Sequence, residues 1–212
     1  GYFSLSSTLA TAIGPLLGIV LMQYSGFDMI FLSCNILALI SILCIFMAKI
    51  KNVELTVEQK DAFKKIHWKD FFEEKALPIS LIMFIMGIAF SGVLTFINSY
   101  ALILNLALAS KFFFLIYAIF IILSRPFTGR LLDMKGDNFI MYPALCVYGV
   151  SLFSLSEART DNFFLIAGAL IGLGFGTVMS SSQVIATKKS PRHRMGLATA
   201  TFFFALDFGV GI

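Results

Sequence analysis

The fold of this chain is decided by residues 111–153, KFFFLIYAIFIILSRPFTGRLLDMKGDNFIMYPALCVYGVSLF. Two almost wholly apolar runs, 111–123 and 139–153, flank a short segment that contains three basic and two acidic residues. Because neither run alternates between polar and apolar residues, each is predicted to be a helix and not a barrel strand. The pattern therefore predicts a protein whose chain crosses a membrane repeatedly.

The composition of the whole chain supports the same class. It is 58% hydrophobic and only 13% charged, with 24 Phe and one Trp. Soluble domains are roughly 45–50% apolar and about 25% charged. A chain of 212 residues cannot bury this much hydrocarbon in its own core, so a bilayer must act as the solvent. We therefore expect an all-α, polytopic membrane protein.

Seven apolar spans follow one another along the chain. Each approaches the roughly 20 residues that cross about 30 Å of hydrocarbon. The spans are 2–22, 29–49, 78–104, 112–124, 139–156, 162–187 and 196–212. The fourth is expected to continue, with a bend, through Pro126 to Thr128. Because the chain begins and stops within a span, we expect a truncated protein.

The charges of the loops predict the orientation in the membrane. Loops 49–77, 125–138 and 188–195 contain all but two of the 16 Lys and Arg residues, the exceptions being Lys111 and Arg159. By the positive-inside rule these loops are cytoplasmic. This also accounts for the net charge of +4 without a nucleic-acid partner.

The longest loop, 50–77, is predicted to contain an amphipathic helix at the cytoplasmic interface. Its apolar side would be formed by Phe63, Ile66, Trp68, Phe71 and Phe72. A partner-binding motif is the alternative interpretation.

Residues typical of enzymes and metal sites are not grouped in this sequence. Cys34, Cys44 and Cys146 lie within apolar runs without paired spacing, as small hydrophobic residues do. His67 and His193 lie in basic loops. No nucleophile elbow or P-loop is present in the sequence, so we expect neither enzymatic activity nor a cofactor or metal.

The segment GRLLDMKG, residues 129–136, has a glycine on each side of the Asp133 carboxylate. Glycines permit a tight turn. Asp133 is predicted to accept hydrogen bonds from the N-terminus of a neighbouring helix, which would latch two helices on the cytoplasmic side. An ordinary loop carrying positive-inside charges is the alternative.

This segment resembles the cytoplasmic signature of the major facilitator superfamily, G-x-L-a-D-r-x-G-r-k. The matching residues are Gly129, Leu131, Asp133 and Gly136. Met134, Asp137 and Asn138 depart at usually basic positions, as in the second-half copy of the motif. The resemblance implies a loop between helices 8 and 9 of a twelve-helix transporter. It assigns a cytoplasmic gate to Arg125, Gly129, Arg130, Asp133 and Gly136.

A second stretch, GYFSLSSTLATAIGPLLGIV, is similar to the helix-5 signature of proton-coupled exporters in that superfamily. The matching residues are Gly1, Gly14, Pro15 and Gly18, whereas Ala10 and Ile19 replace two glycines. Independently of the family, Gly14 and Pro15 are predicted to kink or loosen this helix.

Together the two motifs imply a two-bundle fold that is represented by about helices 5–11. Residues 1–49 would be the last two helices of the N-terminal bundle. Residues 50–77 would be the cytoplasmic linker, and 78–212 the C-terminal bundle without its last helix. Aligning Gly1 with Gly196 also aligns Gly14 with Gly209, which is consistent with parallel repeats.

That alignment places Asp207 where the earlier helix has Ala12. Asp207 lies about 16 Å beyond Gly196 along a helix. A charged carboxylate there costs roughly 2.5–3.5 kcal/mol on insertion scales, so it should face a cavity or a partner. We predict a role in proton coupling or cation recognition. A structural hydrogen bond, or a position near the end of the span, remains possible.

Other polar residues embedded in the spans are candidates for lining a substrate cavity. They are Asn35, Asn98, Tyr100, Tyr117 and Gln183. Each could equally bond to a neighbouring helix, a contact worth about 0.6 kcal/mol on average.

The resemblance implies a secondary transporter of the plasma membrane that exports a small drug-like or metabolite substrate in exchange for protons, by alternating access. Its partners would be the substrate, protons and the bilayer. A proton-coupled symporter that imports a metabolite is the alternative. A seven-helix receptor is disfavoured, because the loop charges place the N-terminus of the first span in the cytoplasm.

Overall fold

The computed structural model describes residues 2–47, 71–191 and 194–212, and every regular element within them is an α-helix. The helices are α1 (Tyr2–Met47), α3 (Leu77–Ile103), α4 (Ala107–Lys135), α5 (Asp137–Ser156), α6 (Asp161–Lys189) and α7 (Met195–Gly211). Five helical segments of the described chain are long and apolar enough to span a bilayer. The prediction of an all-α membrane protein is therefore confirmed. The amphipathic helix expected in the linker falls largely on residues 48–70, outside the described residues.

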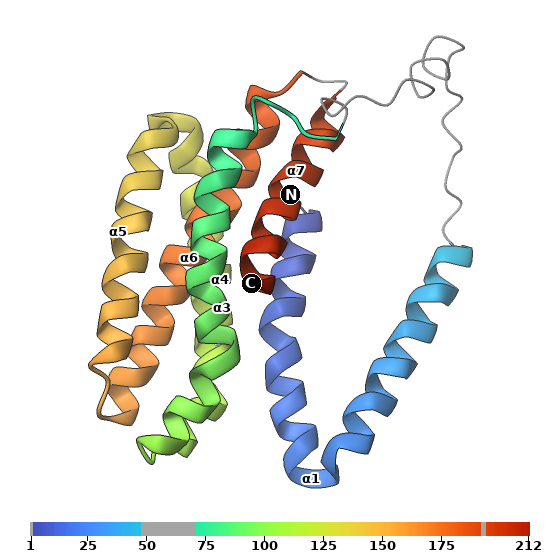
Figure 1. The fold of residues 1–212 in the computed structure, drawn as a ribbon, viewed down its shortest axis with the longest axis vertical. Coiled ribbons are helices and arrows are strands. Elements are labelled where there is room, and N and C mark those ends of the chain that lie inside the picture. The colour runs from blue at the N-terminus through green and yellow to red at the C-terminus, as the bar shows by residue number, and fades with distance from the viewer. Residues whose placement is uncertain (1, 48–70, 192–193) are drawn as a thin grey trace.

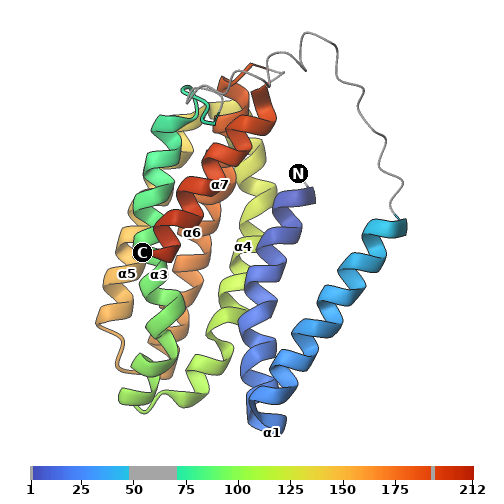
Figure 2. The same ribbon diagram turned by 45° about the vertical axis from the view of Figure 1, so that its right-hand side comes forward.

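Helix α1 consists of two arms that meet at Gly26, where the chain reverses its direction (Figure 1). Gly26 has φ 75° and ψ −173°, which a residue with a Cβ atom rarely adopts. The helix continues through Gly14 and Pro15, and its backbone leaves helical dihedral angles at Gly26. The first arm lies beside α4 (Figure 2).

The remaining helices form a bundle with two columns, α4–α6–α5 and α3–α7, in which these neighbours pack most closely (Figure 1). Glycines permit the close approach. A Cβ atom on Gly172 of α6 would lie 2.5 Å from the Tyr117 carbonyl oxygen of α4. One on Gly87 of α3 would lie 2.8 Å from the Leu206 carbonyl oxygen of α7. The helices within each column therefore lie at distances that larger residues at these two positions would not allow.

Aromatic rings fill the space between the two columns. Phe90 of α3 stacks on Phe175 of α6 with ring centroids 4.1 Å apart. Tyr117 lies 5.7 Å from Phe90, and Tyr148 lies 5.8 Å from Phe175, again between ring centroids. All four residues are buried, so the centre of the bundle is a packed apolar core.

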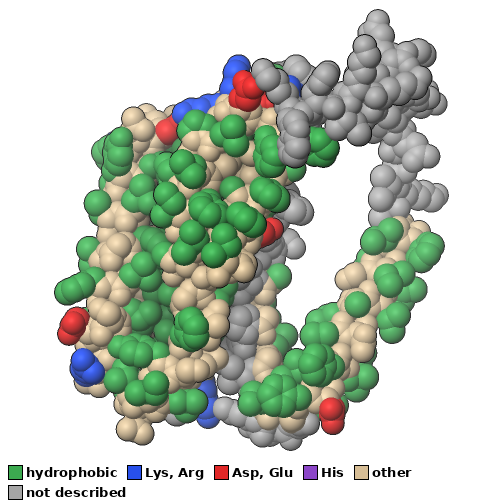
Figure 3. Space-filling view, viewed as in Figure 1, with side chains coloured by type: hydrophobic (Ala, Val, Ile, Leu, Met, Phe, Trp, Pro, Cys, Tyr) green, Lys and Arg blue, Asp and Glu red, His purple; other side chains and the backbone are tan. Residues whose placement is uncertain are grey.

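The outer face of the bundle is apolar as well. Figure 3 shows hydrophobic side chains over most of the visible surface, with most of the charged side chains at the two ends of the bundle. Phe127, Phe153 and Ile85, for example, are at least 60% exposed. A surface of this kind is expected where lipid chains take the place of water.

The largest difference from the predicted boundaries lies in α4. This helix continues to Lys135, beyond the predicted end at Thr128. The prediction of a turn around Asp133 is therefore wrong, because Asp133 lies within the helix. Only Gly136, with φ 84°, lies between α4 and α5. The extension has a physical reason, because Leu132 packs into the core while Asp133 and Lys135 remain exposed.

Candidate functional site

The candidate site lies at one end of the bundle, where α4 and α6 end and α3 and α7 begin (upper end in Figure 1). The predicted gate residues Gly129, Arg130 and Asp133 are exposed in the last turns of α4, and Gly136 follows them. Arg125 lies deeper in the same helix and is half-buried. This is the end for which the loop charges predict a cytoplasmic position.

Asp133 forms an ion pair with Lys188, in the last turn of α6. The Lys188 Nζ donates to the Asp133 Oδ1 at 2.7 Å. The partner predicted for Asp133 was the N-terminus of a helix, and that prediction is wrong: the partner is a lysine near the C-terminus of α6. Lys188 is also well placed for the negative end of the α6 dipole. Since the Asp133 side chain is 70% exposed and that of Lys188 52%, water can compete for both charges.

A cavity of about 270 Å³ lies between α4 and α6. Its lining includes direct sequence neighbours of the two residues of this ion pair. It brings together Arg125, predicted as a gate residue, and Gln183, predicted as a cavity residue. The other residues lining it are Thr128, Gly129, Leu132, Ser180, Ser181, Val184 and Thr187. The sequence did not indicate that Arg125 and Gln183 share one cavity.

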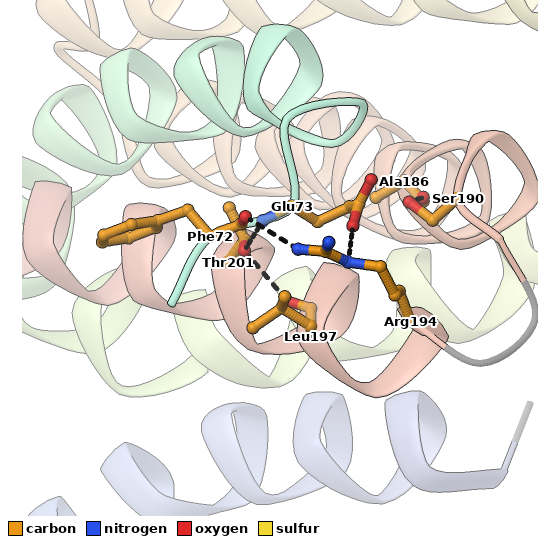
Figure 4. A network of polar contacts seen from close by, with 7 residues as sticks. All are labelled: Phe72, Glu73, Ala186, Ser190, Arg194, Leu197 and Thr201. Atoms are coloured by element: carbon orange, nitrogen blue, oxygen red, sulfur yellow. Dashed lines mark hydrogen bonds and ion pairs between the residues drawn. The ribbon is translucent and has the colours of Figure 1, made fainter. Parts of the chain in front are cut away.

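A second network joins the segment before α3 to the beginning of α7 (Figure 4). The Arg194 Nε lies 2.6 Å from the Glu73 Oε2, and the Glu73 side chain is only 6% exposed. The Glu73 backbone N–H donates to the Thr201 Oγ1 at 2.9 Å. The Arg194 Nη2 also donates to the Phe72 carbonyl oxygen at 3.5 Å. A buried carboxylate requires this kind of compensation by charge and hydrogen bonds.

The two ion pairs have equivalent positions in the bundle. Asp133 and Lys188 connect α4 to α6, whereas Glu73 and Arg194 connect the start of α3 to the start of α7. Each closely packed column is thus fastened at the same end by one ion pair. The two pairs differ in burial, because the Glu73 carboxylate is shielded from water and the Asp133 carboxylate is exposed.

Asp207 lies on the opposite side of α7 from the residues that pack against α3. Its side chain is exposed, whereas Leu206 and Gly209 are buried. In the described part of the chain Asp207 forms no hydrogen bond or ion pair. It lies near the far end of α7, away from the end that carries Arg194. The structure therefore does not bring Asp207 together with the gate residues.

The other cavity candidates are scattered. The Tyr100 hydroxyl donates to the Ser156 carbonyl oxygen at 3.0 Å and thereby joins α3 to α5. The Asn98 Oδ1 is buried and has no hydrogen-bond partner among the described residues. Tyr117 is 2% exposed and belongs to the aromatic core, and Asn35 is exposed on the second arm of α1. Of these candidates, Gln183 lines a cavity together with the gate residues Arg125 and Gly129.

Of the helix-5 motif, Gly1 lies outside the described residues, and Gly14, Pro15 and Gly18 lie in the first arm of α1. A Cβ atom on Gly14 or Gly18 would meet no described atom within 4 Å. No contact within the described part of the chain therefore requires a glycine at these two positions.

Four residues of this site were not predicted from the sequence: Glu73, Lys188, Arg194 and Thr201. Glu73 shortly precedes the apolar span at 78, and Arg194 shortly precedes the span at 196. An acid and a base at the starts of two spans could have suggested a pair. Nothing in the sequence, however, distinguishes Glu73 from Glu74.

A helical bundle with an apolar exterior and ion-paired helix ends defines a polytopic membrane protein. The sequence model of the Major Facilitator Superfamily matches residues 1–212, and the chain belongs to that family. It is 24% identical over its whole length to an uncharacterized MFS-type transporter of Methanocaldococcus jannaschii, of which it covers 56%. Over 56% of its length it is 32% identical to the multidrug resistance protein MdtG of Salmonella choleraesuis, covering 30% of that protein. The corresponding value for MdtG of Escherichia fergusonii is 33%. No solved structure matches.

The chain thus spans about half the length of the archaeal relative and less of MdtG.

Proposed function

We propose that this protein is part of a secondary active transporter of the plasma membrane that exports a small drug-like or metabolite substrate in exchange for protons. The observation that carries the proposal is the Asp133–Lys188 ion pair, which joins α4 to α6 through a residue of the segment that resembles the superfamily signature. The similarity to proteins named for multidrug resistance supports export of drug-like compounds. Residues 1–49 and 78–212 would belong to two bundles that rock about a central site, joined by a cytoplasmic linker at 50–77.

The two ion pairs would have different roles in this motion. Exposed pairs contribute about 0–1 kcal/mol, so Asp133 and Lys188 can separate and reform within a transport cycle. Removing one partner of a buried pair costs about 3–5 kcal/mol, so Glu73 and Arg194 would stay together. In this proposal α3 and α7 move as one body, and the cytoplasmic end of α4 and α6 opens and closes.

Asp207 would couple this cycle to protons. It is a carboxylate in an otherwise apolar helix, and it does not lie on the face that packs against α3. A charged side chain is costly in hydrocarbon, so Asp207 would have to face an aqueous cavity or a bound cation during part of the cycle. Export would follow if substrate binds the ionised form and protons displace the substrate.

The test uses the protein in proteoliposomes with an imposed pH gradient and a panel of labelled cationic drugs and metabolites. Gradient-driven transport is compared for the native protein, Asp207→Asn and Asp161→Asn, a control acid at the start of α6. We expect transport opposite to the proton flux, abolished by Asp207→Asn and retained by Asp161→Asn. Transport in the direction of the proton flux would instead identify a symporter. Unchanged pH dependence in Asp207→Asn would refute coupling through this residue.

A further inference from the structure

Helix α5 lies at an edge of the bundle and packs most closely on α6 (Figure 1). Its other side carries an exposed, mostly apolar stripe, here called the α5 stripe. It consists of Phe139, Tyr142, Cys146, Val150 and Phe153. Their spacing of three or four residues places them on one side of the helix, along almost its whole length. Phe139 is 50% exposed and Tyr142 is 66% exposed, so acyl chains of the bilayer can lie against them.

A cation is fixed at the end of the α5 stripe that carries Phe139. Lys135 is the last residue of α4, and its Nζ lies 4.4 Å from the centroid of the Phe139 ring. Only Gly136, with φ 84°, separates α4 from α5, and this sharp turn brings the two residues together. An ammonium group over the face of an aromatic ring is attracted by the ring quadrupole. The ring therefore helps to keep the Lys135 charge at the end of the stripe.

The charge of Lys135 is not balanced by an ion pair within the described part of the chain. Of the two acids nearest in sequence, Asp133 is paired with Lys188. Asp137 lies in the first turn of α5, where the helix dipole already favours a negative charge. An aromatic ring has no net charge, and the Lys135 side chain is exposed. An anion from outside the chain can therefore approach the ammonium group.

A cation at the end of a lipid-facing apolar stripe fits a ligand with an anionic head and hydrocarbon chains. Lysine reaches the membrane interface with its ammonium group while its stem stays on apolar surface. Anionic phospholipids attract basic residues at the cytoplasmic surface, the side predicted for this end of the bundle. A free anion could use Lys135 but not the stripe. A zwitterionic lipid could use the stripe but would gain less from the charge.

We propose that Lys135 and the α5 stripe form a binding site for an anionic phospholipid. The headgroup phosphate lies at the Lys135 ammonium group, and an acyl chain lies along Phe139 and Tyr142. The site is separate from Asp207 and from the Asp133–Lys188 ion pair, and it does not rest on the transport function proposed above.

The experiment measures which lipid occupies the site. Phe139→Trp in a Trp68→Phe background places a single tryptophan there, and it keeps an aromatic ring beneath Lys135 because tryptophan is the best partner for a cation. The full chain is reconstituted into phosphatidylcholine bilayers. These contain increasing fractions of either phosphatidylglycerol or phosphatidylcholine that is brominated in the upper part of its acyl chains. Bromine quenches tryptophan fluorescence at short range, so the two quenching curves give the relative affinity of the site. We expect a several-fold preference for phosphatidylglycerol.

Matched variants locate the origin of this preference. Lys135→Gln should abolish it, whereas Lys135→Arg keeps the positive charge and should retain it. Lys189→Gln removes a positive charge at the same end of the bundle, on α6, and should also retain it. A second probe, Phe153→Trp in the same Trp68→Phe background, lies near the other end of the α5 stripe and should show no preference. The described residues among these are all exposed, so the substitutions leave the packed core intact.

Three results would overturn the proposal. The first is equal quenching of Phe139→Trp by the two brominated lipids. The second is an equal loss of preference in Lys135→Gln and Lys189→Gln, which would attribute the preference to the general surface charge. The third is an equal preference at Phe153→Trp, since Lys135 cannot reach the other end of the stripe.

Discussion

Glu73 and Arg194, far apart in the sequence, form an ion pair of 2.6 Å whose carboxylate is almost completely shielded from water. Asp133 and Lys188, at the same end of the bundle, form a pair of 2.7 Å that is mostly exposed. The nitrogen–oxygen distance is nearly equal in the two pairs, whereas the burial of their side chains differs. Their contributions to stability should therefore differ strongly.

The first prediction concerns the buried pair. Glu73→Ala should reduce the free energy of unfolding by about 3–5 kcal/mol, because Arg194 would lose its counter-charge in a partly buried place. Asp133→Ala should change it by no more than about 1 kcal/mol. Denaturation in detergent, monitored by circular dichroism, measures both. Equal effects of the two variants would mean that burial does not separate the pairs.

The exposed pair should matter for transport instead. Asp133→Lys, or Lys188→Asp alone, brings like charges together and should slow transport several-fold with little change in stability. The double variant Asp133→Lys with Lys188→Asp restores an ion pair and should recover much of the rate. Uptake by proteoliposomes measures this rescue. A double variant as slow as the single ones would exclude a role for the pair itself.

Helix packing gives a third prediction. Gly172→Ala forces its Cβ atom to within 2.5 Å of a backbone oxygen of α4, and this overpacking should cost about 1–3 kcal/mol. Gly149→Ala is the matched control, because a Cβ atom there meets nothing within 4 Å. The control should stabilise its helix by about 0.5–1 kcal/mol. Thermal unfolding measures both effects. We expect the unfolding midpoint to fall in Gly172→Ala and to rise in Gly149→Ala, relative to the native protein.

The fourth prediction concerns orientation. In a background with Cys34, Cys44 and Cys146 replaced by Ala, Asn138→Cys and Glu157→Cys place single thiols at opposite ends of α5. The positive-inside rule predicts that Glu157→Cys reacts with a membrane-impermeant maleimide applied to intact cells. Asn138→Cys should react only after the membrane is opened. The reverse pattern would invert the assignment of the cytoplasmic end.

Much of the fold could be predicted from the sequence, because a span of about 20 apolar residues has few stable alternatives in a bilayer. The end of α4 could not. Pro126 and Gly129 are both residues that weaken helices, yet α4 continues past them to Lys135. The burial of Leu132 against the neighbouring helices outweighs the local preference, and only tertiary structure reveals that contact.

The candidate site was less accessible to prediction. The motif identified Asp133 as important, but its partner is set by the way α6 ends beside α4. Glu73 and Arg194 were not found at all, because a pair between distant loops leaves no local pattern. Asp207 remains a prediction from its charge and position, since the described residues provide no partner for it.

The stacked rings of Phe90 and Phe175 have a consequence for the route of a solute. Their ring centroids are 4.1 Å apart, and together with Tyr117 and Tyr148 the two rings fill the centre of the bundle. A solute cannot thread this bundle as an ion threads a channel. In the transporter proposed above, the path of a solute would therefore run along the flank of this bundle, and the side chains of its walls, not those of its interior, would contact the solute.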